Sequence, residues 1–451
     1  MQLRSRSWQP LHEKPRDGAR ALVELSLFMG AAVVIGAVTG CVSVSFLLLL
    51  RFLGERRVLV MQWAHEGTWV QGILVVLIVA VMAALAAAMV KHLSPEAEGS
   101  GIPRVEAIAT HHMEPGPARI LPIKYLGGLL SIGAGLALGR EGPSVQMGAT
   151  IAGIGSKVFR RPPEEMRTLI AAGAAAGLAT AFNAPIAGAI FVLEELLKRF
   201  DTKTTMATLT ASASAFAVAQ LFVDSNELSV APLRQPRLED AAGYVVVGIV
   251  VGLLAVAYNS AIMGALRFVD RSRVPVELRA AFIGGVVALV GMQAPHLIGG
   301  GEPLTSRILH DDFLLSAIVI ILVLRFALGA LSYAALTPGG LFAPMLVVGA
   351  SAGLMVGKVG NLLLPVIFAE PAALALAGMA AFFAASVRAP VTGIILATEM
   401  TGSVILLPPM LGASAVAVMV AILWRCEPIY DQLARRSAQA SNEYHQKRSM
   451  R

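Results

Sequence analysis

The sequence predicts an all-α polytopic membrane protein made of two related halves of interrupted helices. Three observations lead to this fold class: long apolar segments with almost no charge, Gly/Pro-rich breaks in and between them, and an internal repeat. Of the 451 residues, 56% are apolar and 14% are charged. An average soluble domain has about 25% charged residues. This composition excludes a soluble enzyme and a disordered chain.

Six segments are long and apolar enough to span a bilayer as helices, which takes about 20 residues each. One of them, Ala21–Leu50, contains a single charged residue, Glu24. The other five contain none: Gln71–Val90, Thr168–Leu193, Ala241–Leu266, Phe326–Gly357 and Val404–Trp424. The chain is therefore expected to cross the membrane several times.

The net charge of +7 comes largely from the two ends of the chain, with five basic residues in 1–20 and five in 431–451. Basic segments that flank apolar helices are typical of the cytoplasmic side of a membrane. We therefore expect both termini in the cytoplasm, an even number of crossings, and a lipid bilayer rather than nucleic acid as the partner. Two cysteines, Cys41 and Cys426, do not make a disulfide framework.

A shift of about 200 residues aligns the chain with itself. The matched positions include Gly99–Pro103 with Gly299–Pro303, Lys124 with Arg325, Pro143 with Pro344, and Glu194 with Glu399. We predict a first membrane repeat at 21–225 and a second at 226–430, between a basic N-terminal segment at 1–20 and a basic tail at 431–451. In repeated membrane folds with broken helices, the functional site lies where the repeats meet.

Five breaks interrupt the apolar segments: Gly99–Pro103, Gly139–Pro143, Asn183–Pro185, Pro338–Pro344 and Arg388–Pro390. Backbone freed by such breaks has to be buried in protein or line an aqueous cavity. A helix that starts at a break presents free N–H groups and the positive end of its dipole, so it binds an anion without a full positive charge. The candidate donors are Ser100, Gly101, Ile102, Gly340, Leu341 and Phe342.

Glu141 lies inside the second break, among groups that favour an anion. Its carboxylate can occupy an anion position itself, and protonation would release it. One side chain would then be both a gate and a proton carrier. The alternative for Glu141 is an ion pair with its neighbour Arg140.

Three of these motifs, Gly99-Ser-Gly-Ile-Pro103, Gly139-Arg-Glu-Gly-Pro143 and Gly340-Leu-Phe-Ala-Pro344, resemble the anion-site signatures of the CLC chloride channel and transporter family. The similarity covers roughly residues 21 to 435 and includes Glu194-Glu195 and Pro428-Ile-Tyr430. The resemblance implies two inverted-topology repeats of tilted and broken helices. It also implies a homodimer with one pore per subunit, a prokaryotic type without C-terminal regulatory domains, and a place in the inner (plasma) membrane.

The resemblance also assigns roles to residues. It implies that the bound chloride is held by the hydroxyls of Ser100 and Tyr430 and by the N–H groups of Leu341 and Phe342. It makes Glu141 the extracellular gating glutamate and Glu195 the internal proton acceptor, for which the alternative is a surface carboxylate at a helix end. Lys124 and Arg140 would raise the anion potential near the pore. The subunit interface would use Ile186–Leu197 and Val404–Trp424.

The function implied is chloride transport across the membrane, coupled to protons as an antiport, and a passive anion channel of the same family is the close alternative. A distant alternative is a membrane hydrolase using Ser351, because Gly349-Ala-Ser-Ala-Gly353 matches a hydrolase pattern. That motif lies in an uncharged helical run with no strand before it. We therefore expect no enzyme and no cofactor, with chloride and protons as the transported ions. Leu336-Thr-Pro-Gly339 departs from the usual family sequence, Ser-Gly-Ala-Pro.

Overall fold

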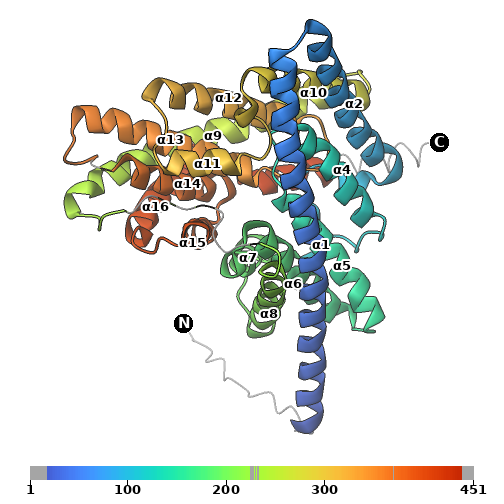
Figure 1. Cartoon of the computed structure of the whole chain (residues 1–451). Coiled ribbons are helices and arrows are strands. Elements are labelled where there is room, and N and C mark those ends of the chain that lie inside the picture. Colours follow the sequence, from blue (N-terminus) through green and yellow to red (C-terminus); the bar gives the residue numbers. More distant parts are fainter. Residues whose placement is uncertain (1–17, 224–227, 229, 231–232, 369, 439–451) are drawn as a thin grey trace, which may run out of the picture.

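The computed structural model describes residues 18–223, 228, 230, 233–368 and 370–438. Within these residues the chain is helical, and its only strand-like pairing is an antiparallel bridge between Gly139 and Gly340. The ends of the predicted basic segments, at 1–17 and 439–451, lie outside the described residues. In Figure 1 the first half of the chain, in blue to green, lies beside most of the second half, in yellow to red.

The described part of the first half contains eight α-helices: α1 (Gly18–Glu66), α2 (Trp69–Leu93), α3 (Ile102–Ala109), α4 (Ile120–Ala134), α5 (Glu141–Val158), α6 (Pro163–Phe182), α7 (Pro185–Phe191) and α8 (Thr202–Ala219). Short turns η1 (Pro95–Ala97) and η2 (Val192–Leu196) precede α3 and follow α7. A similar order of long and short helices recurs in the second half.

The second half contains α9 (Ala241–Arg271), α10 (Val276–Gln293), α11 (Glu302–Leu309), α12 (Leu315–Tyr333), α13 (Phe342–Leu363), α14 (Pro371–Val387), α15 (Pro390–Thr401) and α16 (Leu407–Leu423). The turns η3 (Leu238–Asp240) and η4 (Pro295–Leu297) precede α9 and α11. Helices α1 to α8 thus correspond one by one to α9 to α16. The predicted boundaries of the two repeats, at 21–225 and 226–430, stay predictions.

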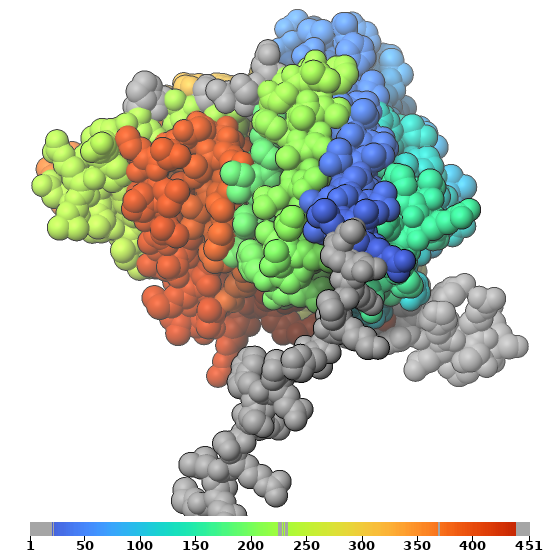
Figure 2. Space-filling view, turned by 90° about the horizontal axis from the view of Figure 1, so that it is seen from below, coloured from blue at the N-terminus to red at the C-terminus, as the bar shows by residue number. Residues whose placement is uncertain are grey.

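Equivalent helix pairs pack in the same way in both halves. Helix α1 approaches α8 at Gly36, where a β-carbon would lie 2.3 Å from the carbonyl oxygen of Ala211. Helix α9 approaches α16 at Gly248, where a β-carbon would lie 2.7 Å from the carbonyl oxygen of Ala413. Small residues allow such close backbone contact between membrane helices. Figure 2 shows α8 beside α1 and α16 beside α9 on one face of the molecule.

Six helical spans among the described residues are long and apolar enough to cross a membrane: Leu22–Glu66, Trp69–Leu93, Leu238–Arg271, Val276–Gln293, Leu315–Tyr333 and Phe342–Leu363. Large apolar side chains are also exposed along them, including Leu77 (56%) and Val323 (61%). Such surfaces suit contact with lipid rather than water. The chain is therefore a multi-pass membrane protein.

Two of the predicted apolar segments are divided by the breaks predicted within them, at Asn183–Pro185 and Pro338–Pro344, so neither is a single helix. Thr168–Leu193 is not a single helix, because Asn183 takes a left-handed conformation (φ 55°) and ends α6. Phe326–Gly357 joins the end of α12, a break and most of α13. Helix α10 was missed because charged residues in its first turn, such as Glu277, shorten the apolar run.

The break between α12 and α13 contains the sequence that departs from the family pattern. Leu336 lies there with φ 57°, in the left-handed region. For a residue with a β-carbon this conformation costs about 1–2 kcal/mol.

Candidate anion site

The three signature breaks meet through backbone hydrogen bonds. Gly339 donates its N–H to the carbonyl oxygen of Gly99, at 3.0 Å. Gly139 and Gly340 each donate to the other, both at 2.7 Å. These two glycines are equivalent positions of the two repeats, so the reciprocal pair is what a local two-fold axis produces. The structure thus joins three motifs that are separated by up to about 240 residues along the chain.

Each of these breaks is followed by a helix whose first N–H groups have no intrahelical acceptor. Helix α3 starts after Gly101, whose φ of 79° suits a glycine, and α5 and α13 start at Glu141 and Phe342. The positive ends of the three helix dipoles therefore lie at one junction. The approach is close, because a β-carbon at Gly142 would lie 2.8 Å from the Cβ of Ser100.

Ser100 is buried at this junction, only 1% exposed. Its hydroxyl oxygen accepts a hydrogen bond from the N–H of Ile102, at 3.3 Å. This places Ser100 and Ile102, both predicted anion ligands, side by side at the start of α3.

The Glu141 carboxylate lies at the start of α13. Glu141 is fully buried, and its Oε2 accepts from the N–H of Ala343 at 3.4 Å. Its Oε1 has no hydrogen-bond partner among the described residues. Oε2 also lies 2.0 Å from the position that a β-carbon on Gly139 would take, so any larger residue at 139 would displace the carboxylate. A carboxylate at this helix end occupies the kind of position that an anion would take.

Arg140 has partners away from Glu141. Its Nε donates to the carbonyl oxygen of Ala181 at 3.0 Å, and its Nη1 lies 3.3 Å from Oε1 of Glu302. Glu302 is not among the residues predicted from the sequence, although the repeat aligns it with Ile102. The ion pair joins the start of α5 in one repeat to the start of α11 in the other.

Lys124 and Arg325 hold equivalent loops in the two repeats. The Nζ of Lys124 donates to the carbonyl oxygens of Ala97 (3.1 Å) and Gly99 (2.7 Å). Arg325 donates in the same way to the carbonyl oxygens of residues 297, 299 and 300, at 3.1, 2.7 and 2.8 Å. Both side chains are fully buried. Lys124 therefore stabilises the loop that carries Ser100.

Tyr430 supplies a second hydroxyl with no hydrogen-bond partner among the described residues. Its side chain is fully buried, and its ring lies edge-on to Phe191, with 6.4 Å between the ring centres. Phe191 in turn packs edge-on against Phe342 at 5.3 Å, which links Tyr430 to the start of α13. Tyr333, whose hydroxyl lies within hydrogen-bonding reach of Ser100, is not among the residues predicted from the sequence. Its only sequence signal is its position just before the fourth break.

Glu195 is a buried carboxylate. It lies in the π-helical turn η2 and is 2% exposed, and its Oε1 has no hydrogen-bond partner among the described residues. The alternative that Glu195 is a surface carboxylate is therefore wrong, although its role in proton transfer stays a prediction. π-Helical turns are rare and often occur at functional sites. Nearby, Lys198 forms ion pairs with Asp431 (2.9 Å) and Glu106 (3.4 Å).

The neighbouring carboxylate, Glu194, has a different environment. Its two oxygens accept from the N–H groups of Val391 (3.0 Å) and Thr392 (2.7 Å), at the start of α15. In the other repeat, Glu399 accepts from the N–H groups of Ile186 (3.1 Å) and Ala187 (2.7 Å), at the start of α7. A negative charge at a helix N-terminus is stabilising. Each repeat thus caps a short helix of the other, which the matching of 194 with 399 could have indicated.

Ser351 lies within α13, fully buried. A serine nucleophile of the G-x-S-x-G type needs a sharp turn between a strand and a helix, with a histidine beside it. Neither flank of Ser351 in the described chain is a strand. Its setting is that of a small residue packed between membrane helices.

Helices whose N-termini meet at a buried junction inside a membrane are typical of proteins that move ions. Residues 82–422 match the family model described as "Voltage gated chloride channel". The H(+)/Cl(-) exchange transporter ClcA of Vibrio parahaemolyticus is 34% identical over 435 residues, 93% of this chain and 91% of that protein. The chain therefore belongs to the voltage-gated chloride channel (CLC) family.

Solved structures agree with this assignment. The crystal structure of a slow cyanobacterial Cl−/H+ antiporter matches with a TM-score of 0.88 and 31% identity, over 92% of this chain and 99% of that one. A CLC-type fluoride/proton antiporter matches with a TM-score of 0.75 and 22% identity, over 90% and 98%, and this likeness shows the fold alone. The predicted family and the predicted all-α, CLC-like membrane fold are confirmed.

Proposed function

We propose that this protein exchanges chloride for protons across a membrane, with Glu141 as gate and external proton carrier and Glu195 as internal proton acceptor. The observation that carries the proposal is the place of the Glu141 carboxylate, at the start of α13 where three helix N-termini meet. The relatives named as chloride/proton exchangers support the choice of ions.

The anion would bind to hydroxyl and N–H donors. These are Ser100 and Tyr430, with the backbone of Gly101, Ile102, Gly340, Leu341 and Phe342. The ionised Glu141 carboxylate competes with chloride for this positive region, since both carry a negative charge. Protonation removes the negative charge of Glu141 and with it the attraction of this side chain to the positive helix ends. Chloride binding and proton binding are thereby coupled through one side chain.

The proton needs a second carrier that is separate from the anion. Glu195 suits this role, because it is buried in η2 and one of its oxygens is free of protein partners in the described chain. The ion pairs of Lys198 with Asp431 and Glu106 would place a charged, hydrated region next to it. Protons and chloride would share the route at Glu141 and separate toward Glu195.

The function is tested with the purified protein in vesicles that hold a chloride gradient. Chloride and proton electrodes are read together, with no proton gradient at the start. We expect chloride movement to drive protons against their own gradient. Chloride flux without any proton movement would identify a passive channel instead. Absence of both fluxes would contradict transport and return the membrane hydrolase to consideration.

We expect the double variant Ser100→Ala/Tyr430→Phe to bind chloride at least about tenfold more weakly. Each lost hydrogen bond to a charged partner contributes about 1.5–3 kcal/mol. Phenylalanine keeps the ring packed on Phe191, so the fold should be unaffected. Calorimetric titration with chloride measures the effect. The control is Ser214→Ala, at a serine of α8 whose hydroxyl donates to the carbonyl oxygen of Val33 in α1. Unchanged affinity in the double variant would remove both hydroxyls from the site.

We also propose that the protein is a homodimer, with the interface on α7 and α16. Ile186 and Leu411 support this because they are 50% and 49% exposed on those helices. We expect Leu411→Trp to shift the protein from dimer to monomer by overpacking the interface. Size-exclusion chromatography with light scattering in detergent measures this shift. The control is Leu77→Trp on α2, and a parent protein that is wholly monomeric would refute the dimer.

Leu193 was one of the positions expected at this interface. It is only 1% exposed within the single chain, so a larger residue there would disturb the subunit itself. We further propose that the protein lies in the inner (plasma) membrane, with both termini in the cytoplasm. Labelling of single cysteines added at the two ends, from each side of the membrane, would test that orientation.

A further inference from the structure

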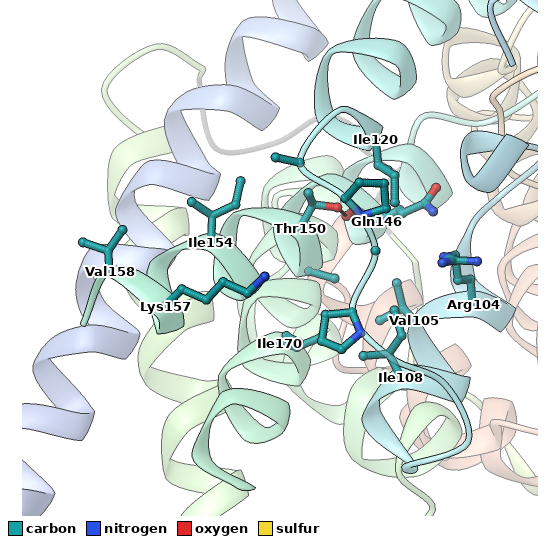
Figure 3. Close-up of a pocket in the computed structure, with 16 residues that line it drawn as sticks. Arg104, Val105, Ile108, Ile120, Gln146, Thr150, Ile154, Lys157, Val158 and Ile170 are labelled. Carbon is teal, nitrogen blue, oxygen red and sulfur yellow. Dashed lines mark hydrogen bonds between the residues drawn. The ribbon is translucent and has the colours of Figure 1, made fainter. Parts of the chain in front are cut away.

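A cavity of about 260 Å³ lies between α3, α5 and the start of α6, beside the segment 115–118. Its walls are mostly apolar, with Val105 and Ile108 from α3, Ile154 from α5 and Ile170 from α6. Figure 3 shows these side chains around a common hollow. None of the residues proposed for anion or proton transfer lines it.

Two cations line this apolar cavity, Arg104 and Lys157. Lys157 has no carboxylate partner among the described residues, and in Figure 3 its amine points toward the hollow. Arg104 lies close enough to Glu96 for their charges to interact, but its Nε is buried with no hydrogen-bond partner in the described chain. Glu96 also forms an ion pair with Arg119, with 3.5 Å between its Oε1 and Nη2 of the arginine. The cavity therefore has unbalanced positive charge on apolar walls.

The cavity lies near one end of α5, where the chain changes from apolar to basic. The side chains of Ile154 and Val158 are 39% and 70% exposed there. Arg160 and Arg161 come after Phe159, the first residue beyond the helix. Exposed apolar residues next to basic residues are typical of the boundary between the hydrocarbon core and the lipid head groups.

We propose that this cavity binds an anionic phospholipid, with the phosphate between Lys157 and Arg104 and one acyl chain along the apolar walls. The two cations of the cavity match the phosphate, and its apolar walls match the acyl chain. The surrounding bilayer supplies such a lipid. A soluble phosphate would leave the apolar walls without a partner. A zwitterionic lipid would bring a second, positive group to a cavity that already has excess positive charge.

The cavity also shares a wall with the anion site. Gln146 lines the cavity, and its Nε2 donates to the carbonyl oxygen of Glu96 at 2.8 Å. The Oε1 of the same side chain packs on Gly101, 2.2 Å from the position of a β-carbon there. A bound lipid would therefore contact the side chain that supports the loop of Ser100.

The test measures lipid binding to the purified full-length protein by native mass spectrometry. The probes are phosphatidylglycerol and phosphatidylcholine with identical acyl chains. We expect the parent protein to retain phosphatidylglycerol at about tenfold lower concentration, the effect of roughly one charge-assisted hydrogen bond. Lys157→Gln should abolish this preference, and Lys157→Arg should keep it. Arg271→Gln, which removes an exposed charge at the end of α9, is the matched control.

A second variant tests the cavity itself. A β-carbon at Gly153 would meet only Ile170, at 3.8 Å, so Gly153→Leu should fold and fill the hollow. We expect it to weaken binding of both lipids, with thermal unfolding as the check on folding. Equal retention of the two lipids by the parent, or an unchanged preference in Lys157→Gln, would overturn the proposal. Displacement of the lipid by millimolar glycerol phosphate alone would instead indicate a site for soluble anions.

Discussion

Glu141→Ala is expected to conduct chloride while moving no protons. In the parent, the Glu141 carboxylate lies at the start of α13 and accepts from the N–H of Ala343. Alanine removes both the negative charge that competes with chloride and the group that carries the proton. Proton flux should fall to the background of empty vesicles, and chloride flux should persist. Paired chloride and proton electrodes on the same vesicles measure both.

Two further variants make this experiment specific. Glu141→Gln keeps the shape of a protonated glutamate but cannot release a proton, so it should also uncouple the ions. Glu164→Gln neutralises an exposed carboxylate in the first turn of α6 and should leave both fluxes unchanged. Proton pumping that continues in Glu141→Ala would show that another residue carries the proton at this end of the route.

Glu195→Gln is expected to stop proton movement while chloride continues at an altered rate. Glutamine fills nearly the same volume in η2 but does not titrate, so the internal end of the proton route is lost. Glu141 remains able to gate in this variant, which is why the chloride rate changes rather than vanishing. The same paired electrodes measure the result. Normal proton pumping by Glu195→Gln would place the internal acceptor elsewhere.

The adjacent carboxylate provides a matched comparison. Glu194→Gln should lower thermal stability, because both Glu194 oxygens accept from the first N–H groups of α15. Loss of the charge and of one acceptor costs about 1–3 kcal/mol. Coupling between chloride and protons should survive wherever the variant folds. Opposite outcomes at 194 and 195 would separate a helix-capping carboxylate from a proton-transfer carboxylate one residue away.

The sequence by itself determined the class of protein, the repeat and the positions of the breaks. These features depend on composition and on local backbone chemistry. An apolar run must be helical in a membrane, and glycine and proline interrupt it where they stand. The family signatures around Ser100, Glu141 and Phe342 are short, contiguous sequence motifs, so they can be recognised without knowledge of the fold.

Only the tertiary structure decided which groups meet. The pairing of Gly139 with Gly340, the ion pair of Arg140 with Glu302, and the capping of α15 by Glu194 join residues more than 150 positions apart. It also decided that Glu195 is buried and that Leu193 faces its own subunit. Such contacts follow from how two repeats pack, which no local pattern encodes. A hydrogen bond or a buried charge is set by its distant partner as much as by its own residue.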